Sequence, residues 1–171
     1  MTEITQETTV RARRRKATPS AGDTPRFTLA DVLAIVPKTK RSQVELLVRT
    51  GRIVPAWPAE GTGHDRAFSG QNLFEIAVAA ELIKLGFVGK RLEHYFGQII
   101  LTILDKRNAI DAEYLVLLPS DDGPMPWIEL LPRTKLESVL GTFTCSYVLN
   151  TRDILRNLRI ALEDFNTRER K

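Results

Sequence analysis

The chain has 171 residues, of which 43% are apolar and 27% charged, a composition typical of a folded protein with one core or two small ones. Its single cysteine, Cys145, excludes an intramolecular disulfide and leaves too few thiols for a zinc ribbon or an iron–sulfur cluster. The net charge of +4 is uneven, because residues 1–68 hold 12 Lys and Arg against 7 Asp and Glu, whereas residues 69–171 hold 13 against 14. This asymmetry favours a polyanionic partner for the first part, although an ordinary solvated surface explains it equally well.

The first 25 residues have almost nothing apolar to bury, so we expect a disordered basic tail at 1–25. Its cluster of positive side chains suits nonspecific contact with a phosphate backbone, or simply solubility, and comprises Arg11, Arg13, Arg14, Arg15 and Lys16. The tail lacks the apolar segment of a secretory signal, and no run approaches the roughly 18 apolar residues of a membrane span. We therefore expect a cytoplasmic protein, with no membrane partner.

Residues 29–36 and 40–50 are predicted to form two short helices joined by a tight turn. Thr28 begins the first helix in a cap-like position, Pro37 ends it, and Gly51 ends the second. Each helix has an apolar face at helical spacing, made of Leu29, Val32, Leu33 and Val36 in the first and Val44, Leu47 and Val48 in the second. Two short helices around a tight turn follow the helix-turn-helix plan.

Polar side chains near the start of the second helix have no obvious role in burial. In a helix-turn-helix this end enters the major groove, where such groups meet base edges or phosphates. Glu45 shares this outer surface, and the predicted DNA-contacting residues are Lys38, Lys40, Arg41, Ser42 and Gln43. Many helical proteins that never contact DNA also have two capped helices with a basic outer face, so this pattern alone leaves DNA binding open.

The stretch RIVPAWPAEGTGHDRAF, residues 52–68, predicts a hairpin of the size of a wing. Ile53 and Val54 begin a short strand, prolines limit its length, and glycines permit a reversal before the chain returns. The tip would present His64 and Arg66 to a phosphate or to the minor groove. An ordinary surface loop is the competing interpretation.

Two further helices are predicted after the hairpin. Residues 69–86 begin at the cap Ser69 and end at Gly86, and residues 92–103 form the second helix, in which Gly97 is a candidate kink. The second helix has a narrow apolar seam, more typical of core packing than of a dimer zipper, made of Leu92, Phe96, Ile99 and Ile103.

Residues 105–171 are predicted to form a small α+β unit. Its elements are a hairpin of 113–119 and 127–132, a helix over 134–140, a strand over 142–150 and a final helix capped by Asn150 or Thr151. A dimerisation module, an effector pocket and a docking surface for a partner all remain open. The apolar stripe of the final helix slightly favours self-association.

No motif indicates catalysis. His64 and His94 lie 30 residues apart without acidic or cysteine neighbours at ligand spacing, which argues against a metal site. Phosphate-binding, dinucleotide-binding and serine-hydrolase motifs are all missing from the sequence. We expect no enzyme activity, no metal and no cofactor, and a small-molecule effector stays open without support.

Four segments of residues 27–96 resemble the DNA-binding domain of the MerR (mercury-resistance regulator) family of bacterial transcription regulators. They are FTLADVLAIV, KTKRSQVELLVRTGRI, GHDRAFSGQNL and ELIKLGFVGKRL. The resemblance implies a winged helix-turn-helix that binds duplex DNA as a homodimer, with its second helix in the major groove and its wing on the backbone. The family's contacts map onto Lys40, Arg41, Ser42 and Gln43 in the helix and onto Arg66 in the wing.

One departure from the family pattern concerns docking on DNA. The family's arginine-tyrosine-tyrosine run falls on Glu45, Leu46 and Leu47, so the usual tyrosine contact with the backbone and its basic neighbour are absent. A relaxed relative of the excisionase or mobile-element type would show such a change.

We therefore expect an α+β protein with three parts: the tail at 1–25, a winged helix-turn-helix with a linking helix at 26–104, and a small α+β dimerisation or effector domain at 105–171. The expected function is sequence-specific binding of double-stranded DNA as a homodimeric, nucleoid-associated transcription regulator. The alternative is a protein-interaction module, antitoxin-like or structural, whose DNA-binding fold is vestigial. Loss of the arginine-tyrosine-tyrosine run favours that alternative.

Overall fold

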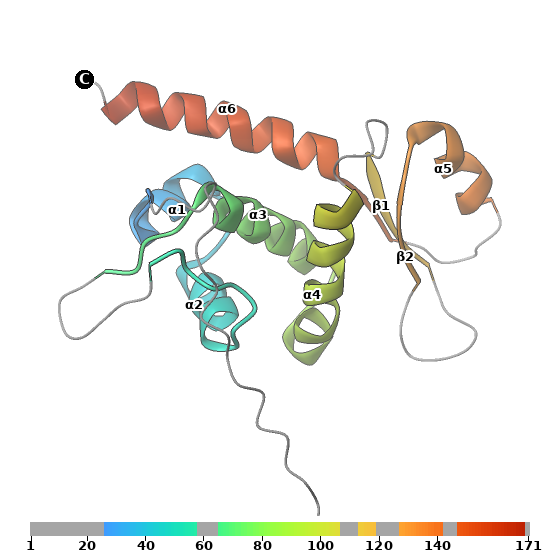
Figure 1. Ribbon diagram of the computed structural model, residues 1–171, viewed down its shortest axis with the longest axis horizontal. Helices are drawn as coiled ribbons and strands as arrows, with labels where there is room; N and C mark the ends of the chain where they lie inside the picture. Colours follow the sequence, from blue (N-terminus) through green and yellow to red (C-terminus); the bar gives the residue numbers. More distant parts are fainter. Residues whose placement is uncertain (1–25, 58–64, 107–112, 119–126, 142–146, 170–171) are drawn as a thin grey trace, which may run out of the picture.

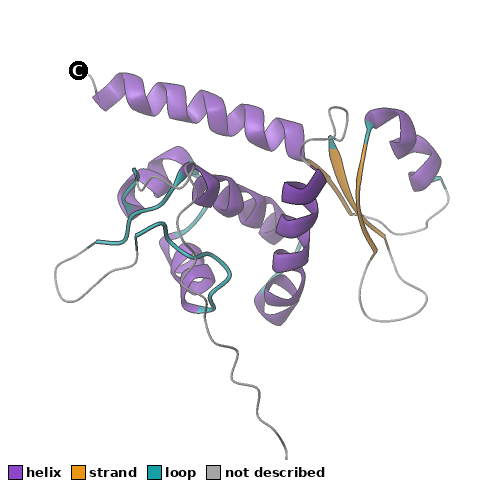
Figure 2. Cartoon of the chain, viewed as in Figure 1, coloured by secondary structure: helices purple, strands orange, loops and turns teal. Residues whose placement is uncertain are grey.

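The computed structural model describes residues 26–57, 65–106, 113–118, 127–141 and 147–169. Within these ranges, helices predominate and a small antiparallel sheet lies at one end, so the fold class is α+β (Figures 1 and 2). In chain order the elements are α1 (Leu29–Ile35), α2 (Arg41–Arg49), α3 (Gly70–Lys84), α4 (Gly89–Lys106), β1 (Tyr114–Leu118), β2 (Trp127–Leu131), α5 (Arg133–Leu140), β3 (Tyr147–Asn150) and α6 (Thr151–Glu169).

Helices α1 and α2 form where the sequence predicts them. The Asp31 amide donates to Thr28 Oγ1 at 3.3 Å, and the Thr28 amide donates to Asp31 Oδ2 at 2.7 Å, which is a capping box. Helix α1 stops before Pro37, which has no N–H to continue it. Helix α2 ends at Arg49, and Gly51, whose φ of 71° lies in the left-handed region that favours glycine, turns the chain after it.

The strand predicted to begin at Ile53 and Val54 does not form. The Ile53 amide instead donates to the carbonyl of Leu47 and completes the end of α2. Val54 precedes a proline, which has no N–H for a ladder, and its carbonyl accepts a hydrogen bond from Asn72. In the described residues around this segment, pairing is confined to two isolated antiparallel bridges, Trp57 with Ala67 and Phe27 with Phe68.

Helices α3 and α4 build the centre of the core. Ser69 caps α3, and Gly86, with a φ of 86°, turns the chain after it. Helix α4 continues through Gly97 without a break. The seam predicted for core packing is buried at all four positions, namely Leu92, Phe96, Ile99 and Ile103.

The sheet has the strand order β2-β1-β3, with both pairings antiparallel. The central strand β1 is an almost continuous apolar run, because both of its faces are covered. Leu115 and Leu117 face the main core, whereas Val116 and Leu118 belong to a smaller cluster against which Leu136 of α5 packs. The sheet therefore lies between α5 and the main body of helices.

The last helix closes the core that the first helices begin. Helix α6 runs across α1 and α3 (Figure 1) and buries Ile154 and Leu158 in the same cluster as the apolar face of α1. The Phe27 and Phe165 rings meet edge to face with centroids 6.3 Å apart, which joins the two ends of the described chain. The predicted domain boundary between residues 104 and 105 stays a prediction. Helix α6, from the predicted part 105–171, completes the hydrophobic core of the predicted part 26–104.

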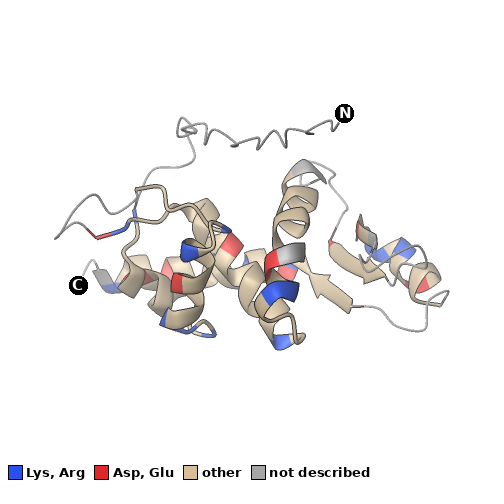
Figure 3. Cartoon of the chain, turned by 90° about the horizontal axis from the view of Figure 1, so that it is seen from below, with Lys and Arg blue, Asp and Glu red and all other residues tan. Residues whose placement is uncertain are grey.

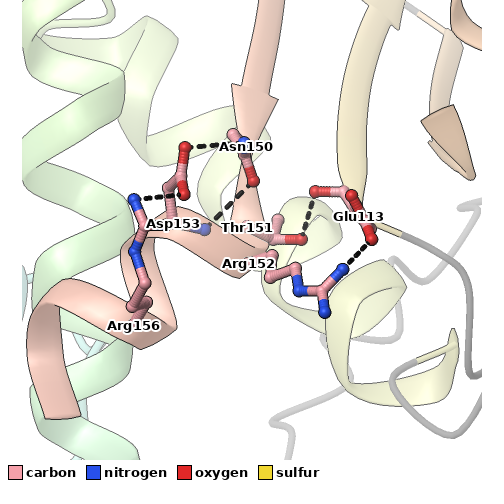
Figure 4. Close-up of polar contacts among 6 residues, drawn as sticks. All are labelled: Glu113, Asn150, Thr151, Arg152, Asp153 and Arg156. Carbon is pink, nitrogen blue, oxygen red and sulfur yellow. Dashed lines mark hydrogen bonds and ion pairs between the residues drawn. The ribbon is translucent and has the colours of Figure 1, made fainter.

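A polar cluster fixes the start of α6 beside the sheet (Figure 4). The Asp153 amide donates to Asn150 Oδ1 at 3.0 Å, and Asn150 Nδ2 donates to Asp153 Oδ2 at 2.7 Å, so Asn150 is the cap that the sequence left undecided. The backbone amide and the hydroxyl of Thr151 both donate to the Glu113 carbonyl at 2.8 Å. The Glu113 carboxylate also pairs with Arg152.

Replacing the cap should destabilise the whole protein, because α6 completes the core. We expect Asn150→Ala to lower the free energy of unfolding by about 1 kcal/mol, measured by urea denaturation followed by circular dichroism. Asn157→Ala, an exposed position in the middle of the same helix, is the matched control and should be neutral or slightly stabilising. Equal losses in the two variants would contradict a capping role for Asn150.

Candidate nucleic-acid interface

The N-terminal end of α2 presents Lys40, Arg41 and Ser42 to solvent, as the sequence predicts. Gln43 is different: its side chain is half-buried, and its Oε1 accepts a hydrogen bond from the Lys40 amide at 2.8 Å. That bond satisfies a backbone donor that the first turn of a helix would otherwise leave unpaired. Gln43 therefore has a structural function at the position that the sequence assigned to base contacts.

Asn72 holds both arms of the segment that leads to Arg66. Its Oδ1 accepts from the amides of Ala56 at 3.2 Å and Ser69 at 3.1 Å, and its Nδ2 donates to the Val54 carbonyl at 3.1 Å. A fourth bond joins Nδ2 to the Glu75 carboxylate at 3.2 Å. All four hydrogen-bonding positions of this buried amide are thus used, and the outgoing and returning arms are tied to the start of α3.

The returning arm brings Arg66 to the same groove as Arg41. This groove, of about 470 Å³, lies between α1, α2 and the arm, and Glu45 and Asp65 also line it. Its remaining lining is mostly apolar and comprises Thr28, Leu29, Ala30, Leu33, Val44, Val48 and Phe68. The structure therefore assembles one surface from two of the predicted contact residues that are distant in sequence. We call it the α2 groove.

The charges of the α2 groove are balanced. Arg41 and Arg66 face Glu45 and Asp65, so the formal charges of the lining sum to zero. Arg41 Nε donates to Glu45 Oε1 at 2.9 Å, in an i,i+4 pair whose side chains are 72% and 48% exposed. Figure 3 likewise shows acidic and basic positions interspersed along the helices. Because the lining has no net formal charge, this groove would recognise a partner through the positions of its hydrogen-bond donors and acceptors more than through overall charge attraction.

Lys38 lies apart from the α2 groove. It lines a second groove of about 260 Å³ between the end of α1, α3 and α6, and its Nζ is 3.8 Å from Glu81 Oε1. The same carboxylate oxygen is 2.6 Å from Lys84 Nζ. Partial burial lowers the pKa of Lys84, but the hydrogen bond with Glu81 and the charge of that carboxylate outweigh burial and raise it above the usual value. Lys38 is therefore engaged with α3, away from Arg41 and Arg66.

Some predicted contacts lie outside the described residues: His64 and the tail residues Arg11, Arg13, Arg14, Arg15 and Lys16. Two residues of the surface were missed. Asp65 lines the groove, and Arg49 is exposed in the last turn of α2, where a cation is favourable to the helix dipole. Arg49 could have been found from the sequence, because it follows Arg41 and Glu45 at helical spacing of four residues on α2. No pattern in the sequence indicated that Asp65 lines the α2 groove.

In the described part of the chain, no group of three or more His, Cys, Asp or Glu side chains is arranged to hold a metal ion. None of the helices in the described ranges combines the length and apolar character needed to cross a membrane. The chain matches no protein-family model, and no curated protein matches it. The resemblance to MerR regulators therefore stays a prediction.

The hydrogen bond of Gln43 separates two residues that the sequence treated alike. We expect Gln43→Ala to lower the free energy of unfolding by about 0.5–1 kcal/mol, because it leaves the Lys40 amide without its partner. Ser42→Ala, at an exposed neighbouring position, should change it by less than about 0.5 kcal/mol. Thermal or urea denaturation of both variants decides, and equal stability of the two would contradict the capping role.

Proposed function

We propose that the protein is a transcription regulator of the MerR-like type that binds double-stranded DNA. In this proposal α1 and α2 are a helix-turn-helix, and residues 52–68 are its wing. The observation that carries the proposal is the meeting of Arg41, at the exposed start of α2, and Arg66, on the returning arm, in one groove. Helix-turn-helix proteins dock the start of the second helix into the major groove while neighbouring segments hold the backbone.

The residues of this surface divide into two kinds of contact. Arg41 and Ser42 lie at the end of α2 that would meet base edges, and such contacts specify a sequence. Arg66 and Lys40 suit phosphates, which fix register without reading sequence. Arg49 extends the exposed side of α2 and offers a further phosphate contact. The basic tail adds a nonspecific attraction of the same kind.

We also propose that the regulator is a homodimer, located with the nucleoid in the cytoplasm. Leu155 and Ile160 are 51% and 52% exposed on α6, and both are large apolar side chains that a second copy would cover. A dimer with twofold symmetry would pair with a palindromic site, one half-site for each α2.

Sedimentation of the purified chain tests the dimer. We expect a mass near twice 19.3 kDa at micromolar concentration, and a shift to the monomer in the Leu155→Glu/Ile160→Glu variant, because buried carboxylates are costly to desolvate. Leu101→Glu, which changes an even more exposed leucine of α4, is the control and should leave the mass unchanged. A monomeric parent protein would contradict this part of the proposal.

One observation favours the alternative, a protein-interaction module. The α2 groove has an apolar floor and no net formal charge, a lining that also suits a peptide segment of a partner. A measurement of DNA binding distinguishes the two functions. Binding to DNA releases counterions, so the affinity of a nucleic-acid site falls steeply as the salt concentration rises.

Fluorescence anisotropy on a random duplex of about 30 base pairs, in a salt series, measures this directly. The full chain is required, since α6 completes the core. We expect binding at low salt with a linear fall of log K against log salt. Absence of binding at low salt would contradict the proposal and favour the protein-interaction module.

Arg66 should act as a phosphate clamp. We expect Arg66→Ala to weaken binding to selected and random duplexes by the same factor and to reduce the salt slope by about one. Arg133→Ala, an exposed change on α5 at the opposite end of the molecule from α2 (Figure 1), is the control and should alter neither quantity. Loss of sequence preference in Arg66→Ala would show that Arg66 reads bases instead.

A further inference from the structure

We infer that Arg41 and Glu45 together read a G·C base pair, with Glu45 accepting a hydrogen bond from cytosine. This inference rests on the proposed function and extends it to the sequence that the protein selects. It explains why the Glu45 carboxylate lies on a surface proposed to contact DNA, although the negatively charged phosphates would repel it.

The pair is placed for recognition of an outside partner. Both side chains line the α2 groove and are exposed, while Leu47, which does not line the groove, is buried on another side of α2. The contact between them uses Nε of Arg41. The two terminal nitrogens of the guanidinium have no hydrogen bond within the described part of the chain. Because the Arg41 side chain is exposed, their donors are available to an outside partner, beside a carboxylate that only accepts.

The order of these groups matches the edge of a G·C pair. In the major groove guanine presents two neighbouring acceptors, N7 and O6, and cytosine presents the N4 donor beside them. The guanidinium of Arg41 supplies two donors, which match guanine N7 and O6. The carboxylate of Glu45 supplies an acceptor beside them, which matches cytosine N4. An A·T pair presents acceptor, donor and acceptor, followed by a methyl group, and would place the adenine amino group against the guanidinium.

Glu45 also disfavours the wrong DNA. The phosphates of any duplex repel its carboxylate, and only a site with cytosine at the matched position offers the N4 donor that offsets this repulsion. Removing this charge should therefore strengthen binding to random DNA and at the same time weaken discrimination. A residue that only stabilised α2 would produce neither change.

The matched control is a pair of the same design on α6. Arg159 Nε donates to Glu163 Oε1 at 3.0 Å, again at i,i+4, with side chains 82% and 64% exposed. This pair lines neither the α2 groove nor the second groove. It lies beside Leu155 and Ile160 on α6, so sedimentation checks that Glu163→Gln keeps the oligomeric state of the parent. Glu163→Gln therefore removes the same charge and the same kind of helix pair away from the surface assigned to DNA.

The experiment selects preferred sites from a random duplex pool with the full-length parent, Glu45→Gln and Glu163→Gln proteins. We expect the parent and Glu163→Gln to enrich one motif with a fixed G·C pair. Glu45→Ala should lose at least about fivefold of its preference for cytosine at that position, whereas Glu45→Gln, which keeps an acceptor oxygen, should lose less. Both variants lack the charge and should bind random duplex more tightly at low salt, and melting curves of all variants confirm that each is folded.

Two results would overturn the inference, and they differ in what else they overturn. An unchanged cytosine preference in both Glu45 variants would remove Glu45 from base reading and leave a DNA-binding regulator standing. Failure of the parent to bind any duplex at low salt would overturn the proposed function together with the inference.

Discussion

The buried amide of Asn72 is the contact on which the geometry of the candidate interface depends. Three hydrogen bonds of one side chain tie the segment after α2 and the segment before α3 to the same point, and a fourth joins that side chain to Glu75. Among the described residues of these segments, backbone pairing is limited to isolated bridges, and the bridge of Trp57 and Ala67 lies next to Arg66. Because buried polar groups are costly to leave unpaired, each bond reinforces the others. A side-chain network therefore does what a strand ladder does in other hairpins, and it sets where Arg66 emerges.

Much of the fold was predictable, because the signals involved are local. Apolar spacing, caps such as Thr28 and Ser69, and the glycine at 86 act over one or two turns of helix, and the helices and strands lie close to their expected positions. The prediction of a strand at Ile53 was wrong because tertiary contacts engage this segment. The Ile53 amide completes the end of α2, and the carbonyl of Val54 is claimed by Asn72, a residue distant in sequence. The strand propensity of the residues gives no information about hydrogen-bonding groups elsewhere in the fold that compete for the same backbone atoms.

The candidate site was predictable in its location and less so in its detail. Exposure of Lys40, Arg41 and Ser42 follows from the helical pattern, because the apolar face of α2 leaves them outside. Gln43 and Lys38 look equally available in the sequence, yet a backbone amide engages the first and Glu81 lies beside the second. The type of a polar residue does not show which partner it will find once the chain is folded. Asp65 joined the α2 groove through the path of the returning arm, which depends on Asn72.

The closing position of α6 has a consequence for synthesis of the chain. Phe27 and Leu158 share one core, although Phe27 precedes the first helix and Leu158 lies in the last described one. Synthesis proceeds from the N-terminus, and domains generally fold as units once their parts have emerged. Helices α1 and α3 must therefore wait, with apolar surface uncovered, until the last turns of α6 leave the ribosome. Chains terminated before α6 would emerge with an unfinished core, so synthesis through α6 decides which copies acquire the complete core that supports α1 and α3.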